Sequence, residues 1–164
     1  MDSLVGITFD KWRELLRQNS RLIPPQYWGK QLTVTAKSLF NSKVANLEKL
    51  EWGENIEQTQ FIKSPIFILG HWRSGTTMLQ NYLSLDPQFA TPRLADVLYP
   101  NSLVRYHHRH NGSLQQSQAA QKRPMDNVEV HLNSPAEDEF ALAVMTLYSP
   151  LYSWVFPNNC GRYD

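Results

Sequence analysis

The residues best suited to chemistry lie in one turn of the chain, Gly70-His-Trp-Arg-Ser-Gly-Thr-Thr77. The turn combines one strong cation, Arg73, with the hydroxyls of Ser74, Thr76 and Thr77 between two glycines. A guanidinium holds two oxyanion oxygens at once, and hydroxyl and backbone N–H groups donate further hydrogen bonds. This composition, with no obvious metal ligand, favours binding of a phosphate ester over a polyphosphate chelated to Mg²⁺. A tight turn whose glycines only permit close packing would explain the same residues.

The residues on either side of the turn predict the elements that position it. Residues 65–69 form a short apolar run with the β-branched Ile66 and Ile68, which is typical of a buried strand in a parallel sheet. After Gly75, apolar residues recur at helical spacing. A strand, a glycine-bounded turn and a helix bring several N–H groups and a helix N-terminus to one point. An anion is stabilised there.

The spacing of the two glycines also matches a nucleotide-binding P-loop, but the residue after the second glycine differs. A P-loop has Lys there to reach the β and γ phosphates, whereas this chain has Thr76. An atypical P-loop kinase therefore stays an alternative only. No metal is expected at this loop, and the histidines of residues 106–112 lack the spacing and the nearby acid of a metal site. We expect a solvated turn at residues 106–112.

The loop, with two later segments, resembles sulfotransferases that use 3′-phosphoadenosine 5′-phosphosulfate. It is similar to the Arg-Ser-Gly-Thr-Thr form of bacterial and tyrosylprotein enzymes, not to the Lys-Ser-Gly-Thr-Thr form of cytosolic ones. The later segments are Arg-Pro-Met-Asp-Asn-Val at residues 123–128 and Ser-Pro-Ala-Glu-Asp-Glu-Phe-Ala-Leu at residues 134–142, and they follow in the expected order. The resemblance runs from about residue 62 to residue 157.

This resemblance implies transfer of a sulfuryl group to a hydroxyl or amine of a small-molecule, carbohydrate or lipid acceptor, without a metal. It assigns binding of the phosphosulfate to Arg73, Ser74, Gly75, Thr76 and Thr77. Arg73 would also act in catalysis, by holding the bridging and sulfuryl oxygens. A truncated, non-catalytic nucleotide-binding protein is a second alternative.

The general base is sought among the acids Glu137, Asp138 and Glu139. The preceding Ser134 and Pro135 complete a capping box with Glu137, which predicts a buried helix from residue 134 through residue 148. Partial burial raises the pKa of a carboxyl toward that of a useful base, although capping and the helix dipole explain acids there equally well.

In tyrosylprotein sulfotransferases the general base is a Glu a short distance after the loop helix. Residues 90–95 follow the predicted loop helix in this chain, and they contain no acid. We therefore predict Glu137 and Glu139 as the catalytic carboxylates, with His131 as a further candidate.

The predicted fold class is α/β, a P-loop-like parallel sheet flanked by helices. Residues 1–60 are predicted as an N-terminal helical segment, and residues 61–164 as the N-terminal part of a sulfotransferase domain. The expected elements are helices at 11–19 (capped by Asp10), 27–50 (with a break near Asn41 and an end near Trp52) and 113–122, and a short strand at 128–132.

With one convincing strand and one weak one, the sheet is expected to be incomplete in this chain. The enzymes that it resembles hold the 3′-phosphate with an Arg and a Ser supplied downstream, and no such segment follows Pro157. We therefore expect the 3′-phosphate-binding half to be absent and the chain to be inactive alone.

Composition narrows the partners and the location. A formal net charge of +1 produces no electrostatic field strong enough to attract nucleic acid nonspecifically. Because Cys160 is the single cysteine, a disulfide framework is excluded. No secretory signal or apolar run of about 20 residues is visible, which favours a cytoplasmic protein without a transmembrane segment. Lysines along residues 27–50 leave peripheral membrane contact open, although a helix that covers the sheet fits the neutral polar face better.

Overall fold

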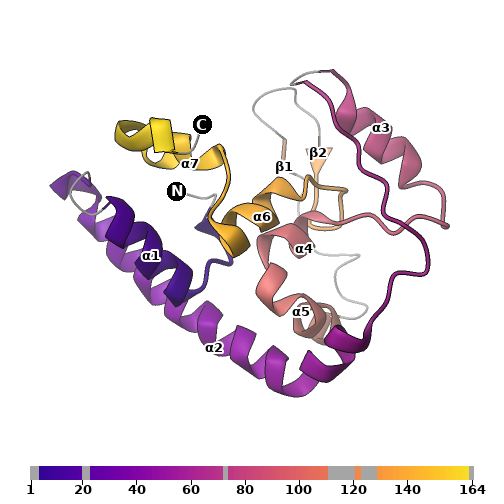
Figure 1. Ribbon diagram of the computed structural model, residues 1–164, viewed down its shortest axis with the longest axis horizontal. Helices are drawn as coiled ribbons and strands as arrows, with labels where there is room; N and C mark the ends of the chain where they lie inside the picture. The colour runs from indigo at the N-terminus through magenta and orange to yellow at the C-terminus, as the bar shows by residue number, and fades with distance from the viewer. Residues whose placement is uncertain (1–3, 20–22, 72–73, 111–120, 123–128, 163–164) are drawn as a thin grey trace.

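The computed structural model describes residues 4–19, 23–71, 74–110, 121–122 and 129–162, and within them the chain is mainly helical (Figure 1). The α-helices are α1 (Phe9–Asn19), α2 (Trp28–Gln58), α3 (Thr76–Leu83), α4 (Leu94–Leu98), α5 (Leu103–His110), α6 (Glu139–Thr146) and α7 (Leu151–Val155). Short 3-10 helices occur at η3 (Pro25–Tyr27), η4 (Pro100–Ser102) and η5 (Pro157–Arg162). In the described ranges the one strand ladder pairs β1 (Gln121–Lys122) antiparallel with β2 (Glu129–Val130).

The predicted parallel sheet is not found among the described residues. Residues 65–69, the predicted central strand, belong to no sheet, and all of their side chains except the half-buried Ile68 are exposed: Ile66 is 64% exposed and Leu69 is 90% exposed. A strand is stable only beside hydrogen-bonded neighbours, and this segment has none in the described part of the chain. The order of apolar segment, turn and helix is as predicted, but the sheet that would make the fold α/β is not.

Both predicted N-terminal helices are present, but Asp10 does not cap the first one, because α1 begins at Phe9 and Asp10 lies inside its first turn. The second helix, α2, is longer than predicted. It shows no break at Asn41, because that amide donates to the backbone oxygen of Ile7 (3.0 Å). The neighbouring Ser42 hydroxyl accepts the N–H of Phe9 (2.7 Å). These polar side chains satisfy backbone groups at the start of α1, and they leave the backbone of α2 undisturbed.

The predicted end of α2 near Trp52 is wrong, since the helix continues to Gln58. Contacts with α5 hold its last turns. The Trp52 ring packs on His108 with ring centroids 5.6 Å apart, and the buried Glu48 carboxylate accepts the N–H of Arg105 (2.8 Å). The prediction of a solvated turn at residues 106–112 is also wrong for residues 106–110, which belong to α5. Residues 111 and 112 lie outside the described residues. Packing between two helices has here replaced the turn that local composition favoured.

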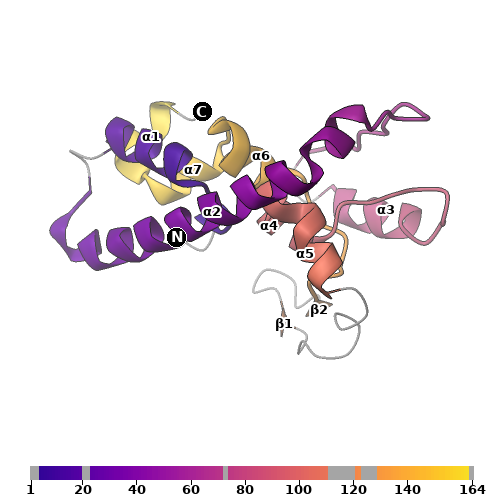
Figure 2. The ribbon, with the colours of Figure 1, turned by 90° about the horizontal axis from the view of Figure 1, so that it is seen from below.

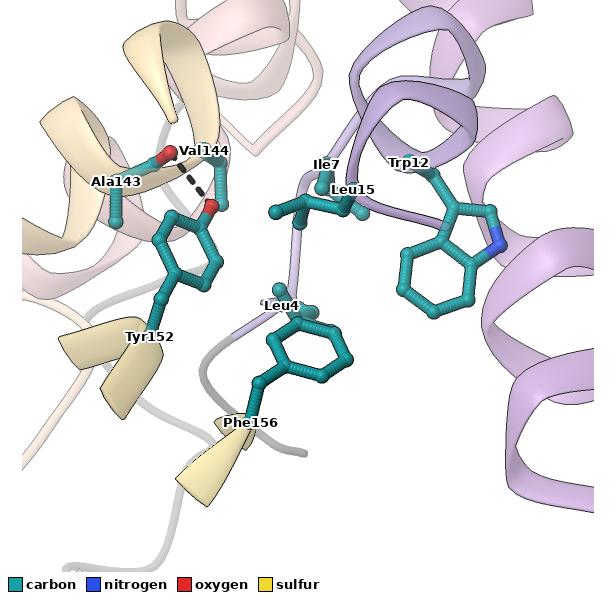
Figure 3. Close-up of a cluster of buried hydrophobic side chains, with 8 residues drawn as sticks. All are labelled: Leu4, Ile7, Trp12, Leu15, Ala143, Val144, Tyr152 and Phe156. Carbon is teal, nitrogen blue, oxygen red and sulfur yellow. Dashed lines mark hydrogen bonds between the residues drawn. The ribbon is translucent and has the colours of Figure 1, made fainter. Parts of the chain in front are cut away.

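One hydrophobic core joins the first and last parts of the described chain (Figure 3). Trp12 is fully buried, and its indole N–H donates to the Thr35 hydroxyl (2.8 Å). From the other side, the Tyr152 hydroxyl donates to the backbone oxygen of Ala143 (2.7 Å). The core consists of Leu4, Ile7, Trp12, Leu15, Ala143, Val144, Tyr152 and Phe156.

The predicted helix at residues 134–148 is shorter at both ends. It begins at Glu139, because the Ser134 hydroxyl accepts the N–H of His131 (2.9 Å) instead of capping a helix. It ends at Thr146, where Leu147 adopts a left-handed conformation with φ of 65°. Ala143 and Val144 are buried on one side of α6, whereas Leu142 and Met145 are exposed on the other. The helix is therefore buried on one side only, and the prediction of a deeply buried helix is wrong.

The predicted helix at residues 113–122 lies almost wholly outside the described residues, and its last two residues form β1. The predicted strand at 128–132 is present in its middle as β2. In the described ranges no group of three or more His, Cys, Asp or Glu is placed to hold a metal ion. None of the described helices is both long enough and apolar enough to span a bilayer.

Burial of Trp12 generates the first prediction. Replacing it by Ala should lower the free energy of unfolding by about 3–5 kcal/mol, because the change opens a large cavity and breaks the bond to Thr35. Trp154→Ala is the matched control, since that ring is 75% exposed, and it should cost less than about 1 kcal/mol. Urea denaturation monitored by circular dichroism measures both. Equal losses would show that the core lies elsewhere.

Candidate functional site

The loop before α3 closes on itself around Gly70. A methyl group at Gly70 would lie 2.7 Å from both the Ser74 Oγ and the Thr76 Cγ2, which is closer than real contacts allow. The N–H and the hydroxyl of Ser74 both donate to the backbone oxygen of His71, at 3.1 and 2.6 Å. Any larger residue at position 70 would therefore force the side chains of Ser74 and Thr76 to move from these positions.

Gly75 forms the junction between the loop and α3. Its φ of +94° lies in the left-handed region, which favours glycine, and its backbone oxygen accepts the first helical bond from Leu79 (3.0 Å). No side chain of the described residues caps the first turn of α3. The first N–H groups of a helix lack partners within the helix, so this end can hydrogen-bond an anion.

The structure brings four of the five predicted loop residues together. Ser74 and Gly75 are exposed, and Thr76 and Thr77 are half-buried in the first turn of α3. Arg73 lies outside the described residues, so its role stays a prediction. The predicted hydroxyls and helix N-terminus do occur on one turn.

A short segment ties α3 to the acids predicted as bases. The backbone oxygen of Ala136 accepts a hydrogen bond from the side-chain amide of Gln80 on α3 (3.0 Å). The Ala136 N–H donates to the backbone oxygen of Pro92 (3.0 Å). Residues 132 and 134 accept the N–H groups of the first two residues of α4, both at 2.9 Å. The segment that ends at Ala136 is therefore fixed between α3 and α4, immediately before Glu137.

The three acids differ in their surroundings. Glu137 and Asp138 are exposed and precede α6, so the predicted capping box with Ser134 does not form. Glu139 is the first residue of α6, and its carboxylate accepts a short hydrogen bond (2.5 Å) from the buried hydroxyl of Ser149. The Glu139 bond therefore runs toward α7, not toward the loop.

A histidine–carboxylate pair, which was not predicted from the sequence, joins α4 and α5. The Nε2 atom of His107 lies 2.6 Å from an oxygen of Asp96, whose other oxygen accepts the N–H of Arg93 (2.9 Å). Burial, and then the charges of Tyr99 and Asp96, raise the pKa of the neighbouring Tyr106 above its usual range. Asp96 thus caps α4 and holds α5, which is a structural role. A helical interpretation of residues 103–110 would have placed this histidine on the side that faces α4.

Comparison with known proteins gives one family. The model of the sulfotransferase family matches residues 65–161, which begin at the predicted strand and include the loop and the acids. The chain is 32% identical over 162 residues to the omega-hydroxy-beta-dihydromenaquinone-9 sulfotransferases of Mycobacterium bovis and Mycobacterium tuberculosis. The chain belongs to the sulfotransferase family.

The two mycobacterial relatives are longer than this chain. The match covers 98% of the chain and 41% of each relative, so the chain spans about two fifths of their length. No solved structure matches the chain significantly.

The second prediction concerns Gly75. Gly75→Ala should destabilise the start of α3 by about 1–2 kcal/mol, because an L side chain is strained at a φ of +94°. Gly29→Ala is the control: it lies inside α2, where a methyl group would contact nothing within 4 Å, and it should stabilise by about 0.5–1 kcal/mol. Thermal denaturation compares the two. A stabilising Gly75→Ala would contradict the left-handed junction.

Proposed function

We propose that the protein carrying this chain transfers a sulfuryl group from 3′-phosphoadenosine 5′-phosphosulfate to an acceptor hydroxyl. The observation that carries the proposal is the glycine-bounded loop at an uncapped helix N-terminus, inside the segment that matches the sulfotransferase family. An uncapped helix start and a close backbone approach suit a bound phosphate ester.

The described residues fit the 5′-phosphosulfate end of this donor. A side chain at Gly70 would collide with the side chains of Ser74 and Thr76, and α3 begins at Gly75 without a side-chain cap on its first N–H groups. The hydroxyls of Thr76 and Thr77 lie beside them on the first helical turn. In the proposed site Arg73 adds the positive charge that balances the phosphate and sulfuryl oxygens.

The proposed reaction forms one bond and breaks one. The acceptor oxygen attacks the sulfur, the bond between sulfur and the bridging phosphate oxygen breaks, and adenosine 3′,5′-bisphosphate leaves. Because the leaving group and the sulfuryl oxygens carry negative charge, Arg73 and the α3 amides lower the barrier by stabilising them. The proton of the acceptor passes to a carboxylate.

Glu137 is the stronger of the two predicted bases. The segment that ends at Ala136 is hydrogen-bonded to α3, so Glu137 follows directly from a fixed point near the loop helix, and its carboxylate is exposed to an acceptor. The carboxylate of Glu139 is instead engaged by Ser149. We therefore assign proton removal to Glu137 and an anchoring role to Glu139.

The acceptor that we propose is an alcohol on an apolar, quinone-like lipid. The support is the 32% identity to enzymes named for an omega-hydroxylated dihydromenaquinone. We place the reaction in the cytoplasm, in keeping with the single cysteine. The kinase alternative is weaker, because Thr76 replaces the lysine of a P-loop and the family match is to sulfotransferases.

The third prediction tests the donor site. Arg73→Ala, made in the whole protein that contains this chain, should weaken binding of adenosine 3′,5′-bisphosphate by about 1.5–3 kcal/mol, the value of a charge-assisted hydrogen bond. Lys63→Ala removes an exposed cation just outside the loop and should leave affinity unchanged. Isothermal titration calorimetry measures both. If Arg73→Ala binds as the parent does, the donor is not held at this loop.

The fourth prediction separates the two acids. Glu137→Gln should lower turnover by about a hundredfold or more without changing donor affinity, because only the proton acceptor is lost. Glu139→Gln keeps an acceptor for Ser149, so turnover should persist while the free energy of unfolding falls by less than about 1.5 kcal/mol. Steady-state assays and denaturation distinguish these results. Full turnover in Glu137→Gln would move the base to Glu139 or His131.

A further inference from the structure

The outward side of α2 carries an exposed apolar stripe, which we call the α2 stripe. Its exposed fractions include 60% for Trp28, 71% for Leu32 and 84% for Leu50, values unusual for large apolar side chains in a helix. The stripe consists of Trp28, Leu32, Ala36, Leu39, Leu47 and Leu50.

The α2 stripe is straight because its residues repeat every eleven positions. Trp28, Leu39 and Leu50 are eleven residues apart, as are Ala36 and Leu47. An 11-residue repeat has roughly 3.67 residues per turn, close to the helical period, so the stripe runs parallel to the axis over about 33 Å. Figures 1 and 2 show α2 along one edge of the molecule, with α1 on one side and no element covering its outer side.

The charged residues of α2 that precede Glu48 are all positive. From residue 23 to residue 47 the sequence contains Lys30, Lys37 and Lys43 and no acid. Lys43 lies within the stripe at the position eleven residues after Leu32, whereas Lys30 and Lys37 lie roughly 130–150° around the helix from the middle of the stripe. The first acid, Glu48, is buried and accepts a hydrogen bond from α5. This half of α2 therefore presents only positive charge beside exposed apolar side chains.

This pattern suits a lipid surface better than a second copy of the chain. Two copies paired in parallel would bring Lys43 against Lys43, and in any pairing of these halves both surfaces are positive. In contrast, lysine ammonium groups extend from an apolar surface to anionic headgroups, while Trp and Leu enter the boundary of the acyl chains. Trp28 and Tyr27, at the start of the stripe, are residues typical of that boundary.

We propose that the α2 stripe lies in the interface of an anionic phospholipid membrane and attaches the protein to it peripherally. The apolar side chains supply the burial, and the three lysines supply attraction to the negative surface. The attachment requires no nucleotide and no turnover, so it can be tested independently of the proposed sulfuryl transfer.

The experiment is vesicle flotation of the whole protein that contains this chain, without nucleotide. The vesicles are phosphatidylcholine alone, and phosphatidylcholine with phosphatidylglycerol. We expect binding to the anionic vesicles that weakens as salt is raised. Leu32→Glu should lower the partition coefficient on the order of a hundredfold, because it removes apolar burial and adds a repelled charge.

Thr33→Glu is the matched control, one residue further along α2. It adds the same charge at an exposed position about 100° around the helix from Leu32, and it should lower partitioning by about fivefold at most. Equal losses for the two variants, or no binding to anionic vesicles, would overturn the proposal. A stable dimer that Leu32→Glu separates would assign the α2 stripe to a second copy instead.

Discussion

Burial of one small core holds the described chain together. Trp12 and the residues around it in α1 pack against Tyr152 and the buried side of α6, so the first helix and the last helices enclose the same apolar volume. The polar atoms of the two large rings are satisfied within this core, by Thr35 and by the backbone of Ala143. Because buried donors without partners are costly, these two bonds fix how the rings are oriented as well as where they lie.

The candidate site depends on that core through a series of packing contacts and hydrogen bonds. The core holds α6, α6 packs on α4, and the segment before α6 pairs with the start of α4 through Ala136 and its neighbours. Gln80 then connects Ala136 to α3, and α3 begins at Gly75. The N-terminal end of α3 and the acids before α6 are thus linked through the Gln80 side chain and the backbone of the segment that ends at Ala136.

The parts predicted correctly from the sequence are those that a few neighbouring residues determine. Gly75 and the apolar spacing after it were sufficient to place α3, and the spacing of Trp12 and Leu15 was sufficient for α1. Errors arose where a distant segment decided the outcome. Pro135 bridges to Arg93, so the local capping box is not used, and α5 extends α2 beyond Trp52. Pairings of this kind leave no local signal, because each partner is an ordinary residue in its own segment.

Two of the exposed apolar surfaces among the described residues require different neighbours. Residues 61–69 belong to no helix or strand, and Ile62 is 99% exposed and Leu69 90% exposed, so they need both apolar cover and partners for backbone N–H and C=O groups. Only another strand supplies both. The α2 stripe belongs to a helix whose backbone bonds are internal, so it needs apolar cover alone. A lipid phase, which offers no backbone partners, can therefore cover α2 but cannot replace the neighbours of residues 61–69.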